Sequence, residues 1–539
     1  MRIDKVYIED FKNLKQFTIN LDEKEMKTVF LGPNATGKSN FFEALIIIFK
    51  YLDLKKDPPK ELNFRYKIEY TIGVYRIIVD FLKGSYEFHV QQKATINGKL
   101  LWVESGKSIS KTDFFKRKDE FLPKYVFTYY SGLSNKLKEL FWEHQNNFYN
   151  KIIKEDFYEG ELESLRKLFY VQLVHSYFVL LAYFSFEDEE KVSIDFLKDV
   201  LHISDVESIL FVLKMPEWAK TGLKKNPDDK FWTAKGLVRE FLELLWDNST
   251  APIYNSERIR TDFNEYIPQK RLYLFVKGKK ELKQIAEFYK SNTEFFKALE
   301  STYISKLISE VRVKVKKENV DGSITFKELS EGEQQLLTVL GLLKFTKDDD
   351  SLILLDEPDT HLNPIWKWKY FEYLENVVMR PDSTQILVNT HDPLVIGNLK
   401  KEEVRVFQIE GGKTIVIEPD IDPRGLGVEG ILTSELFGLP TTLDETTLSR
   451  LERRNELLVK QQQNKLSNTE ANELNEIFGE LEDLGFSKTF RDPLYQKFII
   501  AFKERAKLNS NTRYSKDELA IQNKLALEIL DEIEKEENL

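Results

Sequence analysis

The stretch that decides the fold is "GPNATGKS", residues 32 to 39, which matches the phosphate-loop pattern G-x-x-x-x-G-K-[ST] at every defined position. It follows a short apolar strand predicted over 27–32 and opens a helix predicted from about Lys38 to Tyr51. In that setting the glycines let backbone N–H groups cradle a phosphate, Lys38 reaches the β and γ phosphates, and the Ser39 hydroxyl ligates Mg²⁺. We therefore predict ATP binding by Gly32, Pro33, Asn34, Ala35, Thr36, Gly37, Lys38, Ser39 and Asn40.

A second apolar strand, "SLILLDEP" (351–358), ends in two carboxylates. Such an ending alone is often a solvated acidic turn, but a phosphate loop in the same chain gives it a chemical purpose. Asp356 is predicted to hold Mg²⁺, directly or through water. Glu357 is one residue further along, where it could polarise a water molecule as a general base.

A third apolar strand runs into "NTHDP" (389–393). His391 could hydrogen-bond the γ phosphate, and together with Lys38 and Glu357 it completes the predicted catalytic set. A histidine at a strand end is otherwise an ordinary structural residue, and "DTHLNP" (359–364) alone is a plain turn before a helix.

The stretch "ELSEGEQQLLTVLGLL" (328–343) has two compatible interpretations. Ser330 and Glu333 before an apolar run form a capping box, the usual start of a helix. The same helix start, with its free N–H groups, can bind a phosphate.

These motifs, in this order, resemble the heads of ABC-type ATPases, with "LSEGEQQ" in place of the family signature "LSGGQ". The resemblance implies that the signature contacts ATP bound to an opposing head, and that the loop after the acidic pair faces that head. The residues it assigns are Ser330, Glu331, Gly332, Glu333 and Gln334 in the signature, and Asp359 and His361 in the loop. The family's glutamine loop stays open among Gln91, Gln92 and "YYSG" (129–132).

The opening "IEDFKNLKQFTINL" (8–21) is similar to the first strand pair of the SMC, RecF and OLD-like branch of these heads. There a basic residue after the phenylalanine approaches the nucleotide, which implies that role for Lys12. A solvated strand lysine is the alternative.

The predicted fold class is α/β: a P-loop ATPase head with a mixed sheet and an antiparallel β subdomain, a helical insertion and a helical C-terminal region. Residues 1–132 form the first half of the head, 133–305 the insertion, 306–421 the second half and 422–539 the C-terminal region. Prolines interrupt the insertion and no heptads are sustained, so we expect compact helices rather than a coiled-coil arm. Its apolar run at 168–186 contains Gln172 and His175 and is expected to be a buried helix rather than a membrane span.

The composition sets further limits. Of 539 residues, 79 are Lys or Arg and 89 are Asp or Glu, so the net charge of −10 argues against a strongly basic nucleic-acid binder without excluding a local basic surface. The absence of cysteine excludes disulfides and thiol catalysis and fits a reducing cytoplasm.

The whole chain resembles the ATPases of bacterial anti-phage systems, in particular the PtuA family of Septu systems, through "YYSG", "DEPDTHLNP", "NTHDP" and "DPRGLGVEGILTSELFGLPTTLDETT" (422–447). The resemblance implies a homo-oligomer joined through its heads, a separate HNH nuclease (PtuB-like), and in some systems a retron reverse transcriptase with its DNA–RNA product, so that DNA is reached through the complex. Three alternatives are a RecF- or SMC-like DNA-repair or DNA-tethering ATPase, an OLD-like ATPase–nuclease and a transporter ATPase. No D-x-D cluster follows "GVEG" (427–430), which argues against an intrinsic nuclease.

Overall fold

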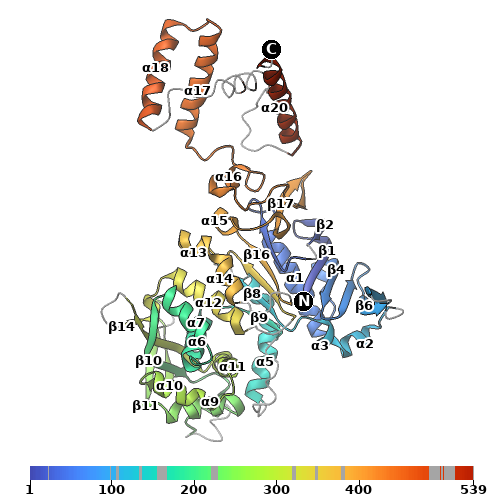
Figure 1. Ribbon diagram of the computed structural model, residues 1–539. Coiled ribbons are helices and arrows are strands. Elements are labelled where there is room, and N and C mark those ends of the chain that lie inside the picture. Colours follow the sequence, from blue (N-terminus) through green and yellow to red (C-terminus); the bar gives the residue numbers. More distant parts are fainter. Residues whose placement is uncertain are drawn as a thin grey trace. The chain divides into compact units, whose positions relative to one another are not determined.

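The chain forms two compact units, Met1–Asp422 and Pro423–Leu539, in the computed structural model (Figure 1). The structure describes residues 1–537 apart from 22–23, 97–98, 105–107, 133–135, 155–166, 220–228, 261, 319–322, 346–349, 378–382 and 485–515, and within the last range it describes Phe498, Phe502 and Arg505.

The centre of the first unit is a seven-stranded sheet whose neighbouring strands are parallel except at one edge. In spatial order the strands are β18 (Lys413–Ile417), β17 (Val404–Glu410), β3 (Lys27–Leu31), β16 (Gln385–Asn389), β15 (Leu352–Asp356), β8 (Val126–Tyr130) and β9 (Leu168–Tyr170). Only β18 runs antiparallel to its neighbour. Strands β15 and β16 are buried along their whole length, as expected for parallel strands covered on both faces. The carboxyl ends of β3, β16, β15 and β8 therefore meet at one edge of the sheet.

One helix and a second sheet cover one side of this sheet. Helix α1 (Lys38–Leu54) is buried nearly all round, which is the pattern of a helix packed between two layers. The second sheet is antiparallel, and one apolar core joins it to α1 and the central sheet. Its strands, in spatial order, are β2 (Leu14–Asn20), β1 (Arg2–Phe11), β4 (Arg65–Ile72), β5 (Tyr75–Asp80), β6 (Glu87–Ile96) and β7 (Lys99–Glu104). The predicted mixed sheet and antiparallel subdomain are thus confirmed.

The inserted segment 133–305 is only partly helical, which corrects the prediction. Strands β10 (Ile203–Lys214), β11 (Thr250–Arg260) and β12 (Tyr266–Val276) join β13 (Ile308–Lys317) and β14 (Ser323–Thr325) in an antiparallel sheet of order β11-β12-β10-β13-β14. Two of the prolines that interrupt the insertion, Pro252 and Pro268, lie in the β11–β12 hairpin at the edge of this sheet, where a missing N–H is tolerated.

The helices of the insertion pack on this sheet and on the head. They are α4 (Lys136–Leu140), α5 (Trp142–Lys154), α6 (Val174–Ser185), α7 (Lys191–Asp199), α9 (Gly236–Asp247), α10 (Lys279–Ala286) and α11 (Asn292–Ile304). The apolar run at 168–186 forms β9 and the buried helix α6, as predicted. No helix in the described ranges is long and apolar enough to cross a membrane.

Helix α12 (Glu331–Phe345) packs against α6 at unusually close range. A Cβ atom on Gly341 would come within 2.2 Å of Val179 Cγ1, and the Tyr183 hydroxyl donates a hydrogen bond to the Gly341 carbonyl at 3.0 Å. The insertion is therefore joined to the head through the helix that follows the signature.

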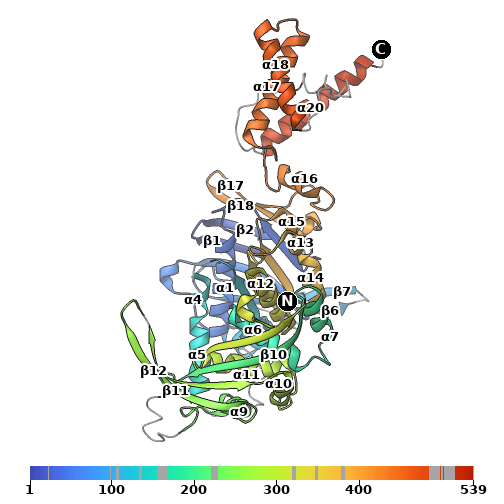
Figure 2. The same ribbon diagram turned by 90° about the vertical axis from the view of Figure 1, so that its left-hand side faces the viewer.

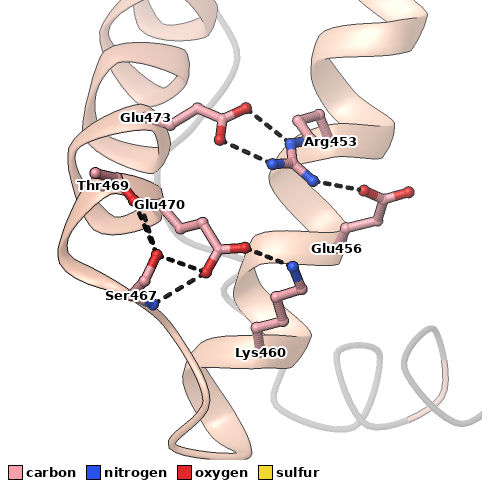
Figure 3. Close-up of polar contacts among 7 residues, drawn as sticks. All are labelled: Arg453, Glu456, Lys460, Ser467, Thr469, Glu470 and Glu473. Atoms are coloured by element: carbon pink, nitrogen blue, oxygen red, sulfur yellow. Dashed lines mark hydrogen bonds and ion pairs between the residues drawn. The ribbon is translucent and has the colours of Figure 1, made fainter.

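The second unit contains α16 (Gly427–Thr433), α17 (Glu445–Gln462), α18 (Asn468–Asp483) and α20 (Lys516–Glu537). Helices α17 and α18 form a hairpin around a small apolar core of Leu457, Leu474, Ile477 and Leu481. Figure 3 shows the polar contacts beside that core: Arg453 donates to both oxygens of Glu473 at 2.7 and 2.9 Å, and Lys460 contacts Glu470. Glu470 also accepts from the Ser467 backbone N–H, which caps α18.

Candidate ATP-binding site

The phosphate loop joins β3 to α1 and depends on its two glycines. Gly32 has φ 129°, and a Cβ there would lie 2.2 Å from the carbonyl oxygen of Phe407 in β17. Gly37 has φ 103°, and a Cβ there would lie 2.7 Å from Leu14 Cδ2. At Gly32 a side chain would collide with strand backbone, and at Gly37 it would strain a backbone of positive φ and displace the Leu14 side chain.

Neighbouring side chains hold the loop in shape. Asn13 Nδ2 donates to the Ala35 carbonyl at 2.9 Å, and its oxygen accepts from Asn40 Nδ2 at 2.7 Å. Thr414 Oγ1 in β18 donates to the Thr36 carbonyl at 3.0 Å. The loop is thus preorganised from both sides, and the sequence motif gave no indication of Asn13 or Thr414.

Lys38 lies within the curve of the loop and is 6% exposed. Its ammonium donates to the carbonyl oxygens of Gly32 at 2.7 Å and Pro33 at 3.1 Å. Burial lowers the pKa of Lys38 to about 8, although the nearby charges of Glu357 and Asp356 oppose that shift. A half-desolvated ammonium held by backbone carbonyls is suited to an incoming phosphate.

Asp356 ends β15 and is 1% exposed. One carboxylate oxygen accepts from Asn389 Nδ2 at 3.0 Å, and the other has no hydrogen-bond partner among the described residues. Burial raises the pKa of Asp356, while the hydrogen bond from Asn389 and the nearby Ser39 hydroxyl act to lower it. A buried unpartnered carboxylate oxygen beside a hydroxyl fits Mg²⁺, which prefers oxygen ligands and takes the remainder from water and substrate phosphates.

Glu357 and His391 face each other at the ends of β15 and β16. Glu357 Oε1 lies 3.2 Å from His391 Nε2, and the Glu357 N–H donates to the Asn389 carbonyl at 2.9 Å. Burial, then the charges of Asp359 and Asp356, raise the pKa of Glu357 to about 7. Burial and the Lys38 charge lower the pKa of His391 to about 4, so this histidine is neutral and the contact is not an ion pair. A carboxylate with its pKa near neutrality has the property required of a general base.

The signature region begins α12 with the predicted capping box. The Ser330 N–H donates to Glu333 Oε2 at 2.8 Å, and the Glu333 N–H donates back to Ser330 Oγ at 3.3 Å. Ser330 and Glu331 are exposed. Gly332 is buried, and a Cβ there would lie 2.5 Å from the carbonyl oxygen of His361. The glycine therefore allows the start of α12 to contact the loop after the acidic strand.

The other residues assigned to contact an opposing head differ in their exposure. Asp359 is 2% exposed and accepts from Thr390 Oγ1 at 3.0 Å. Glu333 is buried beside Lys317, and the Gln334 side chain donates to the Leu329 carbonyl at 2.8 Å. His361 is partly exposed, with Nδ1 3.2 Å from Glu331 Oε2. Only Ser330, Glu331 and His361 therefore present side chains at the surface.

A glutamine that the motif analysis missed connects these parts. Gln335 Oε1 accepts from the His361 N–H at 3.1 Å, and its Nε2 donates to the Glu357 carbonyl at 3.5 Å. Gln335 directly follows the signature residues 330–334, and this position was the feature of the sequence that could have indicated its role.

Of the three candidates for the glutamine-loop position, "YYSG" lies at the site. The Ser131 N–H donates to the Asp356 carbonyl at 3.2 Å, and Ser131 Oγ is 3.0 Å from Thr360 Oγ1. Gln91 and Gln92 lie within β6 of the antiparallel sheet.

Lys12 lies in the turn between β1 and β2 with φ 54°. Its ammonium pairs with Glu43 of α1, and Lys136 binds the other oxygen of the same carboxylate at 2.8 Å. Burial lowers the pKa of Lys12. The side chain thus contacts the helix behind the phosphate loop, and its approach to nucleotide stays a prediction.

Comparison with known proteins identifies the family. The AAA ATPase domain (AAA_15) matches residues 1–396. Septu protein PtuA of Bacillus mycoides (strain KBAB4) is 27% identical over 202 residues, which cover 35% of this chain and 26% of that protein. "Retron Vc95 probable ATPase" of Vibrio cholerae serotype O1 biovar El Tor is 25% identical over 113 residues, covering 19% and 21%. The chain thus spans about a quarter of the length of these curated relatives.

Solved structures were also compared. The SMC head domain from Thermotoga maritima is 12% identical, covers 78% of this chain and all of that one, and has a TM-score of 0.31. The RecF–ATP structure is 13% identical, covers 77% and 97%, and has a TM-score of 0.25. Because the family match extends over most of the sequence, the chain belongs to the AAA ATPase domain family, and it is similar to the Septu protein PtuA.

Proposed function

We propose that this ATPase binds MgATP, closes head-to-head on it with a second copy, and thereby controls a separate HNH nuclease in anti-phage defence. The observation that carries the proposal is the meeting of Lys38, Asp356, Glu357 and His391 at one sheet edge, with a buried carboxylate oxygen on Asp356 that lacks a partner. This is the charge arrangement that phosphoryl transfer to water requires.

Each side chain has a distinct part in the proposed reaction. Lys38 leaves its backbone carbonyls for the β and γ phosphates, and Ser39 with Asp356 would hold Mg²⁺, which neutralises phosphate charge. Glu357 accepts a proton from the attacking water, because its raised pKa makes it a sufficiently strong base near neutral pH. The neutral His391, 3.2 Å away, has one N–H to donate. We assign it to the Glu357 carboxylate in the nucleotide-free chain and to the γ phosphate when ATP is bound.

The proposed dimer is supported by the surface at the start of α12. Ser330, whose hydroxyl is hydrogen-bonded to Glu333 at the helix start, is exposed beside Glu331 and His361. We assign these residues to the nucleotide held by the opposing head. Glu357→Gln should trap an ATP-dependent dimer by preventing hydrolysis, whereas Lys38→Ala should stay monomeric. Size-exclusion chromatography with light scattering, with and without MgATP, measures both, and a Glu357→Gln chain that ignores ATP would contradict the dimer.

The nuclease partnership is supported by similarity to PtuA and to a retron ATPase. A retron reverse transcriptase with its DNA–RNA product is a further proposed partner in some systems. We assign nuclease docking to the C-terminal unit, since α17 and α18 form a separate hairpin with charged faces. A chain ending at Leu443 should bind ATP normally but fail to co-purify with a co-expressed HNH nuclease. Retention of the nuclease by that truncated chain would exclude the C-terminal unit as its docking surface.

A second candidate is a DNA-tethering ATPase of the RecF type. The protein RecF of Lactobacillus johnsonii (strain CNCM I-12250 / La1 / NCC 533) is 31% identical over 97 residues, covering 18% of this chain and 24% of that protein. ATP-dependent duplex binding without any effect on a nuclease would favour this candidate over the first.

A further inference from the structure

The β11–β12 hairpin extends beyond the sheet that carries it (Figure 2). Strand β10 pairs with β12 as far as Arg271, and the Met215 N–H donates one more bond to the Lys270 carbonyl at 3.0 Å. Beyond that point, the described residues of β11 and β12 pair with each other. Both of its faces are largely exposed. A two-stranded ribbon without a covering layer is marginal by itself, which makes a binding role for this ribbon more plausible than a core role.

The register divides the ribbon into two chemically different faces. Residues directly opposite each other on paired strands point to the same side, and side chains alternate along each strand. Arg258 is opposite Pro268, Arg260 is opposite Tyr266, and Ser256 is opposite Lys270. We call this set of six the basic face; it contains three cations and no carboxylate.

On the opposite face, the carboxylate is paired with an arginine of the same face. It carries Glu257, which lies 3.4 Å from Arg271 and accepts from the Tyr273 hydroxyl at 2.5 Å. The two carboxylates of the turn, Asp262 and Glu265, lie beyond the paired strands, and Asp262 accepts from the Phe263 N–H at 2.7 Å.

Among the residues that the structure describes, no carboxylate forms an ion pair with a cation of the basic face. Arg258 and Lys270 have no carboxylate partner in the part of the chain that the structure describes, and Arg260 donates to the carbonyl oxygens of Asp262 and Phe263. Tyr266 is exposed beside Arg260, and Phe263 at the tip is 83% exposed. In a chain with net charge −10, three adjacent uncompensated cations are a local exception.

We propose that the basic face binds the phosphate backbone of a nucleic-acid duplex without reading its sequence. Arginine forks suit phosphate oxygens, and alternate residues on a strand place cations about 6.6 Å apart along a line, so that several phosphates of one backbone can be met together. A two-stranded ribbon also fits the major groove. A polyanion with evenly spaced charges matches this linear surface better than an acidic protein, whose carboxylates need not lie in a row. The proposal goes beyond the ATPase activity and does not depend on it, because the ribbon carries none of the ATP-site residues.

The test uses the full-length chain and fluorescence anisotropy with a random-sequence 30-bp DNA duplex, the same strand alone, and a poly-glutamate peptide. The double variant Arg258→Gln/Lys270→Gln removes two cations from the basic face. The control variant Lys15→Gln/Lys60→Gln removes two exposed lysines elsewhere. We expect the slope of the logarithm of the duplex binding constant against the logarithm of the salt concentration to be smaller in magnitude by about 2 in the double variant. In the control variant this slope should be unchanged. The ATPase rate should be the same in all three proteins.

Each outcome decides the proposal. A smaller salt dependence for the duplex, with or without parallel binding of the single strand, supports phosphate recognition. If the single strand binds more tightly than the duplex, the duplex is not the ligand and the proposal is overturned; Phe263→Ala should then weaken single-strand binding by removing a base-stacking ring. The proposal is overturned if the unmodified chain binds no duplex at low salt, if the double variant behaves like the control, or if poly-glutamate binds equally well and loses that binding in the double variant.

Discussion

Glu357 Oε1 lies 3.2 Å from His391 Nε2, and the two residues follow strands whose last members, Asp356 and Asn389, are hydrogen-bonded at 3.0 Å. The register of β15 on β16 places Asp356 directly opposite Asn389, so the strand pairing itself aligns the metal-binding and base positions. This relationship determines how the site should respond to pH.

The rate of ATP hydrolysis should show a narrow pH optimum. Glu357 must be deprotonated to act as a base and has a pKa of about 7, whereas Lys38 must be protonated to bind phosphate and has a pKa of about 8. Therefore kcat/KM for ATP, which reports the free enzyme, should fall about tenfold per pH unit below about 7 and again above about 8. His391 has a pKa of about 4, so its titration should not change kcat/KM above pH 5. A profile that is flat between pH 5.5 and 9 would exclude Glu357 as the base.

The same raised pKa predicts an effect on stability. A carboxyl whose folded pKa lies above its unfolded value binds its proton more tightly in the folded chain, so its stabilising contribution is lost as pH rises from about 4.5 to about 7. Glu357→Gln should therefore raise the melting temperature of the nucleotide-free protein at pH 8 and change it little at pH 4.5. At pH 8 the free energy of unfolding of the variant should exceed that of the unmodified chain by on the order of 1–2 kcal/mol, a figure already reduced for the screening of Glu357 by solvent. Glu61→Gln, at an exposed position, is the matched control.

Gly332 should be required for packing even without nucleotide. A Cβ at this position would lie 2.5 Å from the backbone oxygen of His361, which cannot move alone. Gly332→Ala should lower the free energy of unfolding of the first unit by about 1–3 kcal/mol. Gly479 in α18 has nothing within 4 Å of the same added atom, so Gly479→Ala should instead stabilise the second unit, by about 0.5–1 kcal/mol. Equal effects in thermal denaturation would contradict the packing argument.

Much of the head could be predicted because its strands are short apolar runs that each end in a polar motif. That pattern located the phosphate loop, Asp356, Glu357 and His391, and their meeting follows from parallel pairing. Asn389 was visible in "NTHDP" but carried no separate signal for its bond to Asp356. The burial of Asp359 arises from a contact with Thr390, and no spacing in the sequence encodes that contact.

The insertion was harder to predict for a different reason. Strands β11 and β12 contain prolines and polar residues on both faces, so they lack the alternation of a half-buried strand. The inner part of β12, from Arg271 to Val276, pairs with β10, a strand distant in the sequence that only the tertiary structure brings there.

The last prediction separates the two roles of Ser330. Its backbone and hydroxyl cap α12 through Glu333, and we have assigned the same hydroxyl to the nucleotide of an opposing head. Ser330→Asp should keep the bond from the Glu333 N–H, because aspartate is an equally good N-cap residue. It loses, however, the hydroxyl that donates to Glu333 Oε2 at 2.9 Å and places two carboxylates side by side. Its free energy of unfolding should fall by about 1 kcal/mol, as in Ser330→Ala, and ATP should still bind at Lys38. The added carboxylate would, however, face the γ phosphate across the interface.

Light scattering should therefore detect no ATP-dependent dimer of Ser330→Asp. Ser330→Arg should also stay monomeric, because the larger side chain prevents the two heads from closing. Ser330→Ala is the complementary variant, since it removes the cap and costs about 1 kcal/mol of stability without adding charge. If Ser330→Asp dimerises on ATP like the unmodified chain, the serine is a helix cap only, and the contact with the opposing nucleotide must be made by other residues.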